Sequence, residues 1–71
     1  MQITEGKSFR LLKDKQIADL LAVSSSWVRK ERFNRRHGLA HSLSIDPIMI
    51  GSVPRYRESE FRSWCDSLST G

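Results

Sequence analysis

The first clear pattern in the chain is an apolar face at helical spacing. Ile17, Leu20 and Leu21 recur at i, i+3 and i+4, the spacing of residues that share one side of an α-helix. Asp14 precedes them, and an acidic side chain is favourable beside the positive N-terminal end of a helix dipole. The pattern predicts a first helix that begins at residue 13 or 14 and ends near Ala22.

Three serines follow this helix, in the segment "LLAVSSSWVRKERF". Ser24 is suited to cap a second helix because its hydroxyl accepts a hydrogen bond from a free amide of the first turn. Val23 can pack as a hydrophobic staple. A serine run also suits a flexible joint, but Gly and Pro, which usually mark turns, are absent here. The segment predicts a tight turn and a helix from Ser25 to about His37, stopped by Gly38.

The region after the second helix changes from irregular to strand-like. Residues 38–47 show no periodicity and are predicted to form a loop. The segment "PIMIGSVPRYR" then predicts a β-hairpin, with strands at residues 48–50 and 55–57 and a turn at residues 51–54.

The last third of the chain combines a two-faced strand with a final helix. Alternation along the second strand places Arg55 and Arg57 on one face and Tyr56 on the other, where we expect Tyr56 to enter the core. Ser59 is the candidate cap of the helix that follows. The apolar face of that helix consists of Phe61, Trp64, Cys65 and Leu68.

The predicted elements come in the order helix, tight turn, helix, loop, hairpin, helix. This is a mainly α domain with a small β-hairpin, in the order of a winged helix-turn-helix. Phe9, Leu11 and Leu12 provide apolar anchors ahead of the first helix. We expect a single domain over residues 9–68, with flexible tails at residues 1–8 and 69–71.

The short chain limits the functions open to it. With 71 residues, it forms one small domain that hides only about 60% of its unfolded surface, too little for a deep cleft between lobes. The sequence has no Ser-His-Asp arrangement and no glycine-rich phosphate loop. We therefore expect no enzymatic activity and no cofactor.

The metal-ligating residue types are sparse. Cys65 is the only cysteine, so an internal disulfide and a cysteine metal cage are excluded, and its apolar surroundings are typical of a small buried hydrophobe. His37 and His41 lie four residues apart, but Gly38 interrupts a helix between them and no nearby carboxylate completes a set of four ligands. We expect no metal site.

Positive charge is concentrated in the middle of the chain, whose formal net charge is +4. Residues 29–57 contain only Glu31 and Asp46 as acids. Their seven basic residues are Arg29, Lys30, Arg32, Arg35, Arg36, Arg55 and Arg57. A solvated surface explains a scattered excess better than this clustered one, so the pattern favours a polyanionic partner.

Two segments resemble one known family when they are taken together. "LLKDKQIADLLAVSSSWVRK" resembles the opening of excisionases and AlpA-type regulators, which are small relatives of MerR-type DNA-binding domains. "PIMIGSVPRYRESEFRSW" resembles their wing and closing helix, and together the two segments span roughly residues 9–68. Three features depart from the family pattern: a longer segment around residues 33–46, Glu31 at a usually apolar position, and Trp27 in place of a smaller residue.

The resemblance implies a recognition helix that enters a DNA groove. N-terminal residues of such a helix reach base edges, which makes Ser25, Ser26 and Arg29 candidates, with Arg29 suited to guanine. Amides at Ser24 and Ser25 are candidates for binding a phosphate. The remaining cations of the helix are expected to hold the DNA backbone: Lys30, Arg32, Arg35 and Arg36.

Two further groups of candidate contacts lie beside that helix. Trp27 either packs beside Val28 or touches DNA, and packing is the commoner role of a Trp in such a position. In the wing, Ser52, Arg55 and Arg57 are expected against a minor groove or its phosphates.

Three functions are compatible with these features. The resemblance implies an excisionase that binds double-stranded DNA near an attachment site and assists an integrase. The short recognition surface of a 71-residue domain favours cooperative self-association of several copies on DNA. An AlpA-like transcriptional regulator would use the same surface, and a protein-interaction module would dock an acidic partner on it. The N-terminus "MQITEGKSFR" is too polar for a signal peptide, and no apolar run approaches a membrane span of about 20 residues. We expect a cytoplasmic location, with nucleoid association through DNA.

Overall fold

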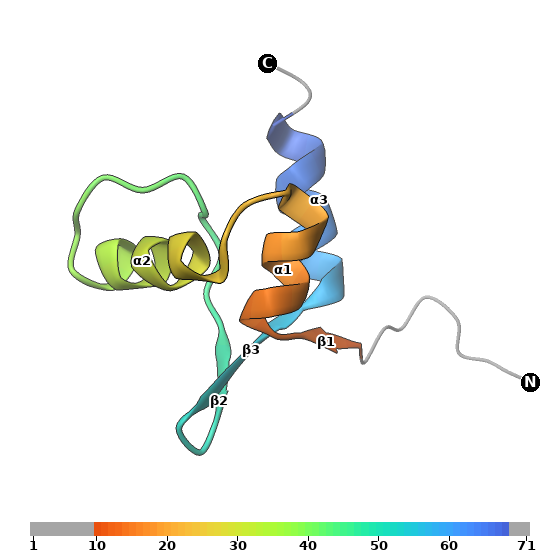
Figure 1. Ribbon diagram of the computed structural model, residues 1–71, viewed down its shortest axis with the longest axis horizontal. Helices are drawn as coiled ribbons and strands as arrows, with labels where there is room; N and C mark the ends of the chain where they lie inside the picture. The colour runs from red at the N-terminus through yellow and green to blue at the C-terminus, as the bar shows by residue number, and fades with distance from the viewer. Residues whose placement is uncertain (1–9, 69–71) are drawn as a thin grey trace, which may run out of the picture.

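Three helices and three short strands make up the computed structural model, which describes residues 10–68 (Figure 1). The elements are β1 (Leu11–Leu12), α1 (Asp14–Leu21), α2 (Ser25–Arg36), β2 (Ile48–Ile50), β3 (Val53–Arg57) and α3 (Glu58–Leu68). About half of these residues are helical, and the strands form one antiparallel sheet. The predicted order of helices and hairpin is confirmed, with β1 as an addition. The predicted anchor Phe9 and the tails predicted at residues 1–8 and 69–71 lie outside the described residues.

Helix α1 begins and ends where the sequence predicted. At its start the Gln16 side chain accepts a hydrogen bond from the Lys13 amide (3.0 Å), which satisfies a donor ahead of the first turn. At its end Ala22 adopts the left-handed conformation, with φ of 60°. The Val23 amide donates to the Ala18 carbonyl (2.9 Å) and the Ala22 amide to that of Asp19 (3.3 Å). These two bonds form a Schellman motif, so the connection to α2 is a tight turn.

The left-handed Ala22 leads to a stability prediction. The left-handed conformation costs a non-glycine residue about 1–2 kcal/mol. Glycine adopts it without that cost but loses about 0.5–1 kcal/mol of additional chain entropy on folding. We therefore expect Ala22→Gly to raise the free energy of unfolding by about 0.5–1 kcal/mol, measured by thermal denaturation with circular dichroism. Gly38 occupies the same position after α2, with φ of +70°. Gly38→Ala should lower stability, and a loss of stability in Ala22→Gly would contradict the account.

Helix α2 is set by the serine cap and the glycine stop. The Trp27 amide donates to Ser24 Oγ (3.1 Å), which confirms Ser24 as the N-cap. The helix ends at Arg36 with His37 as its C-cap, one residue before the predicted end. Beyond it the Gly38 amide donates to the carbonyl of Arg35 (3.3 Å), so Gly38 closes the helix as expected.

The sheet has the strand order β1-β3-β2, and β1 was not predicted as a strand. Leu11 pairs with Arg57 and Leu12 with Tyr56, so the expected anchors are also a third strand. Two residues are too few to show an alternating pattern, which is why the sequence did not reveal it.

The hairpin turn is shorter than predicted. Strand β3 already begins at Val53, which pairs with Ile50, and the turn consists of residues 51–52 instead of 51–54. Pro54 is therefore a strand residue opposite Met49. Strand β1 pairs only with Tyr56 and Arg57 at the end of β3. On that side Pro54 has no neighbouring strand, so its missing amide hydrogen leaves no acceptor of β1 unpaired.

A small core joins all three helices to the sheet. Its buried residues are Leu12, Ile17, Ala18, Val28, Leu43, Tyr56 and Phe61. Trp27, Trp64 and Cys65 pack against this core, and burial raises the pKa of the Cys65 thiol. The prediction that Leu20 and Leu68 share the buried faces is wrong, because both are exposed. The buried side of α1 is centred on Ile17 and Ala18.

The long loop between α2 and β2 is held from both sides. Glu31 Oε1 of α2 accepts hydrogen bonds from the amides of Ser42 and Leu43, the latter at 2.9 Å. From α3, Trp64 Nε1 donates to the Ser42 carbonyl (3.1 Å). Leu43 is thereby buried in the core, a role that the sequence analysis missed. Glu31 thus links α2 to the loop that follows it.

Candidate nucleic-acid interface

One side of α2 is a solvent-exposed stripe that we call the basic stripe. Val28 on the opposite side is fully buried, which fixes the rotation of the helix about its axis. The exposed positions recur at helical spacing and are therefore neighbours on one face. The basic stripe consists of Ser26, Arg29, Lys30, Phe33, Arg36 and His37.

The cations of the basic stripe have no acidic neighbours on this face. Within residues 10–68, Arg29, Lys30 and Arg36 form no salt bridge. Arg29 Nη2 donates instead to the hydroxyl of Ser26 (3.3 Å), one turn closer to the helix start. The stripe therefore presents three uncompensated positive charges to solvent, with Arg29 oriented by Ser26.

Phe33 lies in the middle of the basic stripe and was not among the predicted site residues. Its side chain is 55% exposed, which is unusual for so large an apolar group. The ring lies 4.1 Å from that of His37, centroid to centroid, and His37 Nδ1 donates to the Phe33 carbonyl (2.9 Å). The signal for this position was its spacing, four residues from Arg29 and three from Arg36.

Arg32 differs from its predicted role on the DNA backbone. Its guanidinium points into the domain and forms two hydrogen bonds to the Asp14 carboxylate, of 2.7 and 3.0 Å. The two side chains are only 16% and 17% exposed. The Tyr56 hydroxyl lies 3.5 Å from Arg32 Nη1. The hydrogen bond to Asp14 raises the pKa of Arg32. Through its two bonds to Asp14 this arginine ties α2 to the start of α1.

Arg35 is likewise engaged within the domain. Its Nε and Nη2 donate to the Asp46 carboxylate (2.7 and 3.3 Å), which lowers the pKa of Asp46. Arg35 Nη1 lies 3.2 Å from His41 Nε2, while His41 Nδ1 donates to the Leu39 carbonyl (2.8 Å). Arg35 thus fastens the loop to α2. His37 and His41 have separate partners, and the described part of the chain contains no cluster of metal ligands.

The predicted residues at the start of α2 divide into two groups. The Ser24 hydroxyl accepts the capping hydrogen bond, and Ser25 is half-buried. Trp27 packs against the core, the commoner of the two roles considered for it. Ser26 alone of the three serines belongs to the basic stripe.

The hairpin places its cations as the alternation predicted. Tyr56 is buried on one face of β3, while Arg55 and Arg57 lie on the other. Arg55 Nη1 donates to the carbonyl of Pro54 (2.7 Å), and Arg57 Nε lies 3.9 Å from the Glu60 carboxylate, a loose and exposed contact. Ser52 is exposed in the turn.

The hairpin and α2 adjoin one another. A hollow of about 230 Å³ between them is lined in part by Arg36 of the basic stripe and by Met49 of β2. In Figure 1 the hairpin projects below α2, with its turn at the free end. Met49 shares its side of the sheet with Pro54 and the buried Tyr56, so the hairpin meets α2 on that side, and Arg55 and Arg57 lie on the opposite side of β3.

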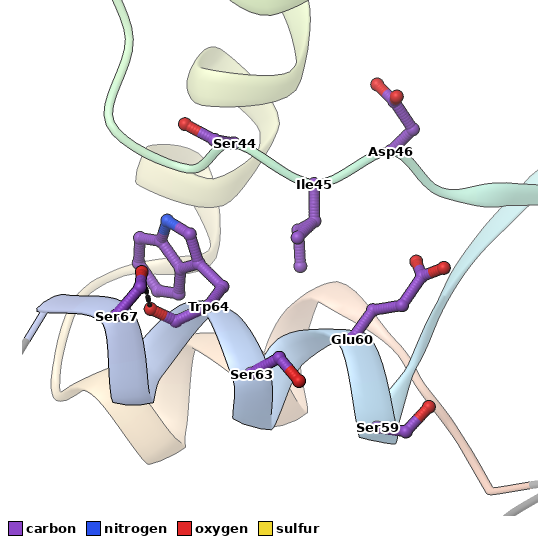
Figure 2. Close-up of a pocket in the computed structure, with 8 residues that line it drawn as sticks. All are labelled: Ser44, Ile45, Asp46, Ser59, Glu60, Ser63, Trp64 and Ser67. Carbon is purple, nitrogen blue, oxygen red and sulfur yellow. Dashed lines mark hydrogen bonds between the residues drawn. The ribbon is translucent and has the colours of Figure 1, made fainter.

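A larger hollow, of about 640 Å³, lies between the loop and α3 (Figure 2). Ile45 and Trp64 point into it, and its rim carries the carboxylates of Asp46 and Glu60. Its lining contains no lysine or arginine. This hollow therefore differs in charge from α2 and the hairpin, which carry the exposed cations.

Comparison of the chain with protein-family models, curated proteins and solved structures gave no match. None of the described helices has the length and apolar character needed to cross a membrane. The assignment of a function therefore rests on the surface described above.

Proposed function

We propose that this chain is a winged helix-turn-helix protein that binds specific sequences of double-stranded DNA. The observation that carries the proposal is the basic stripe, whose three cations face solvent without a carboxylate partner within residues 10–68. Helices α1 and α2 form the helix-turn-helix, α2 is the recognition helix, and the β2–β3 hairpin is the wing.

The recognition helix has the dimensions and chemistry of a major-groove reader. An α-helix with side chains is about 10–12 Å across, and the major groove is about 12 Å wide. Arg29, oriented by Ser26, is suited to a bidentate contact with guanine. Phe33 provides an apolar contact for a thymine methyl group. Lys30 and Arg36 flank these positions and bind phosphates.

The wing adds contacts to a neighbouring part of the duplex. Arg55 and Arg57 lie on the same face of β3, from which guanidinium groups bind phosphates at the edges of the minor groove. Five cations then contact DNA: Arg29, Lys30, Arg36, Arg55 and Arg57.

The resemblance to excisionases extends the proposal to a biological role. In that role the protein binds near an attachment site and assists an integrase in excising a mobile element. The alternative role, an AlpA-like regulator, uses the same surface at a promoter. Selection from a random duplex library would identify the preferred site. In the genome that encodes the chain, that site should lie near an attachment site for an excisionase and at a promoter for a regulator.

The experiment that tests DNA binding is a titration followed by fluorescence anisotropy. A labelled random-sequence duplex is titrated at about 50 and 200 mM salt, and the four phosphate contacts of Lys30, Arg36, Arg55 and Arg57 predict a slope of log K against log salt of about −4. Arg29→Ala/Arg55→Ala should bind more weakly, while Arg62→Ala, an exposed cation on α3, serves as the matched control.

Two outcomes would overturn the proposal. The first is no binding at the lower salt. The second is displacement of the duplex by polyglutamate at an equal concentration of negative charge, which would favour the module that docks an acidic protein.

A further inference from the structure

The tip of the β2–β3 hairpin is apolar and exposed. Met49, Ile50 and Val53 surround the turn and are 48%, 55% and 41% exposed. A domain with so small a core would gain stability by burying such side chains. Their position at the free end of a projecting hairpin (Figure 1) therefore indicates a contact outside the domain.

The strand register places part of this tip on the same surface as the wing cations. Paired residues of neighbouring strands point to the same side of a sheet, and sides alternate along each strand. Ile50 pairs with Val53, and Val53, Arg55 and Arg57 follow at steps of two along β3. Ile50 and Val53 therefore share one face with both arginines, opposite the buried Tyr56.

The hairpin is built to hold this tip firmly. Its turn has only two residues, and Gly51 takes the positive φ of 67° that a tight turn requires. At the other end of β3, Tyr56 is buried in the core and pairs with Leu12 of β1. The apolar tip is thus fixed relative to the recognition helix.

We propose that Ile50 and Val53 form a wedge that enters the minor groove, unstacks a base step and bends the duplex. This inference rests on the proposed DNA-binding function. Minor-groove proteins insert apolar side chains between base steps and kink the duplex by about 20–90°, while flanking cations hold the backbone. The tip supplies the apolar wedge, and Arg55 and Arg57 supply the cations on the same face.

The size of the tip favours DNA over a protein as its occupant. A specific protein interface buries about 800 Å² on each partner, far more than three side chains at a hairpin turn provide. Insertion between bases needs only one or two side chains, and the cations beside them are complementary to the phosphates that flank the inserted site.

The test measures bending and unstacking with the full chain. A duplex of about 20 base pairs containing TA steps, which kink easily, carries donor and acceptor dyes at its ends and, in a second preparation, 2-aminopurine at the steps. The wild-type protein should raise energy transfer and 2-aminopurine fluorescence. In Ile50→Thr/Val53→Thr both changes should fall at least twofold, with the salt slope kept, because the cations are unchanged.

Controls separate this inference from the proposed function. Leu20→Ala removes another exposed apolar side chain, on α1, and should bend DNA like the wild type. Threonine retains β-branching, so the hairpin should fold, and circular dichroism verifies this. If the double variant unfolds, Ile50→Thr alone takes its place with a smaller loss. Binding without bending, or equal bending by the threonine variant, would overturn the wedge alone. Absence of salt-dependent binding by the wild type would overturn both proposals.

Discussion

Replacing Arg29, Lys30 and Arg36 together with alanine should weaken binding to duplex DNA by about 10²–10³-fold at roughly 0.1 M salt. Each phosphate contact contributes about 0.9 to the slope of log K against log salt, so loss of the contacts of Lys30 and Arg36 flattens the slope by about 2 and weakens binding about 60-fold. Loss of the guanine contact of Arg29, worth about 1–3 kcal/mol, brings the total into this range. The three side chains form no salt bridge within residues 10–68, so the folded state loses little when they are shortened. Anisotropy titrations over a range of salt concentrations measure both quantities.

The thermal stability of this triple variant is the internal control. Alanine favours helix, and removal of three like charges from one face relieves repulsion, so the melting temperature should stay the same or rise. Arg62→Ala shortens a cation on α3 and should leave the affinity for DNA unchanged. An affinity retained within threefold in the triple variant would show that α2 is not the recognition helix.

Arg32→Ala should have the opposite profile, with stability lost and the DNA-binding surface intact. Removing one partner of a buried ion pair costs about 3–5 kcal/mol, and the partial exposure of Arg32 and Asp14 reduces the expected loss to about 2–3 kcal/mol. A domain of this length has only about 4–11 kcal/mol of stability in total. Urea denaturation followed by circular dichroism measures the loss.

A double-mutant cycle with Asp14 identifies the cause of that loss. The Asp14 carboxylate accepts both hydrogen bonds from Arg32, so Asp14→Ala/Arg32→Ala should lose less stability than the two single variants added together. At a temperature where Arg32→Ala is folded, it should bind DNA within about threefold of wild type. If Arg32→Ala kept its stability but lost much of its DNA binding, Arg32 would contact the DNA backbone, as the sequence predicted.

Local signals made much of the fold predictable. The limits of α2 follow from a serine hydroxyl that caps its first turn and a glycine that takes the left-handed conformation after its last, and both effects operate within a few residues. The two faces of β3 follow from alternation, which placed Tyr56 in the core and the two arginines outside it.

The candidate site was only partly predictable, because local patterns do not show which side of a helix the rest of the domain covers. The clustering of charge in the sequence predicted one common role for the cations of α2. In the structure Arg29 faces solvent, whereas Arg32 faces Asp14, eighteen residues earlier in the chain. Helical spacing relates residues within α2 but does not show which face the rest of the domain covers. The burial of Val28 decides that, and it also places Phe33 among the exposed cations.

The sequence by itself thus determined the order of the helices and the hairpin, the caps of α2 and the clustering of positive charge, because each depends on neighbouring residues. Only the tertiary structure decided that β1 pairs with β3, that Glu31 and Trp64 hold the loop and that Leu43 enters the core. It also divided the arginines of α2 between the fold and the proposed interface. These features join residues far apart in the chain, and their partners are chosen by packing around a shared core, which no local pattern encodes.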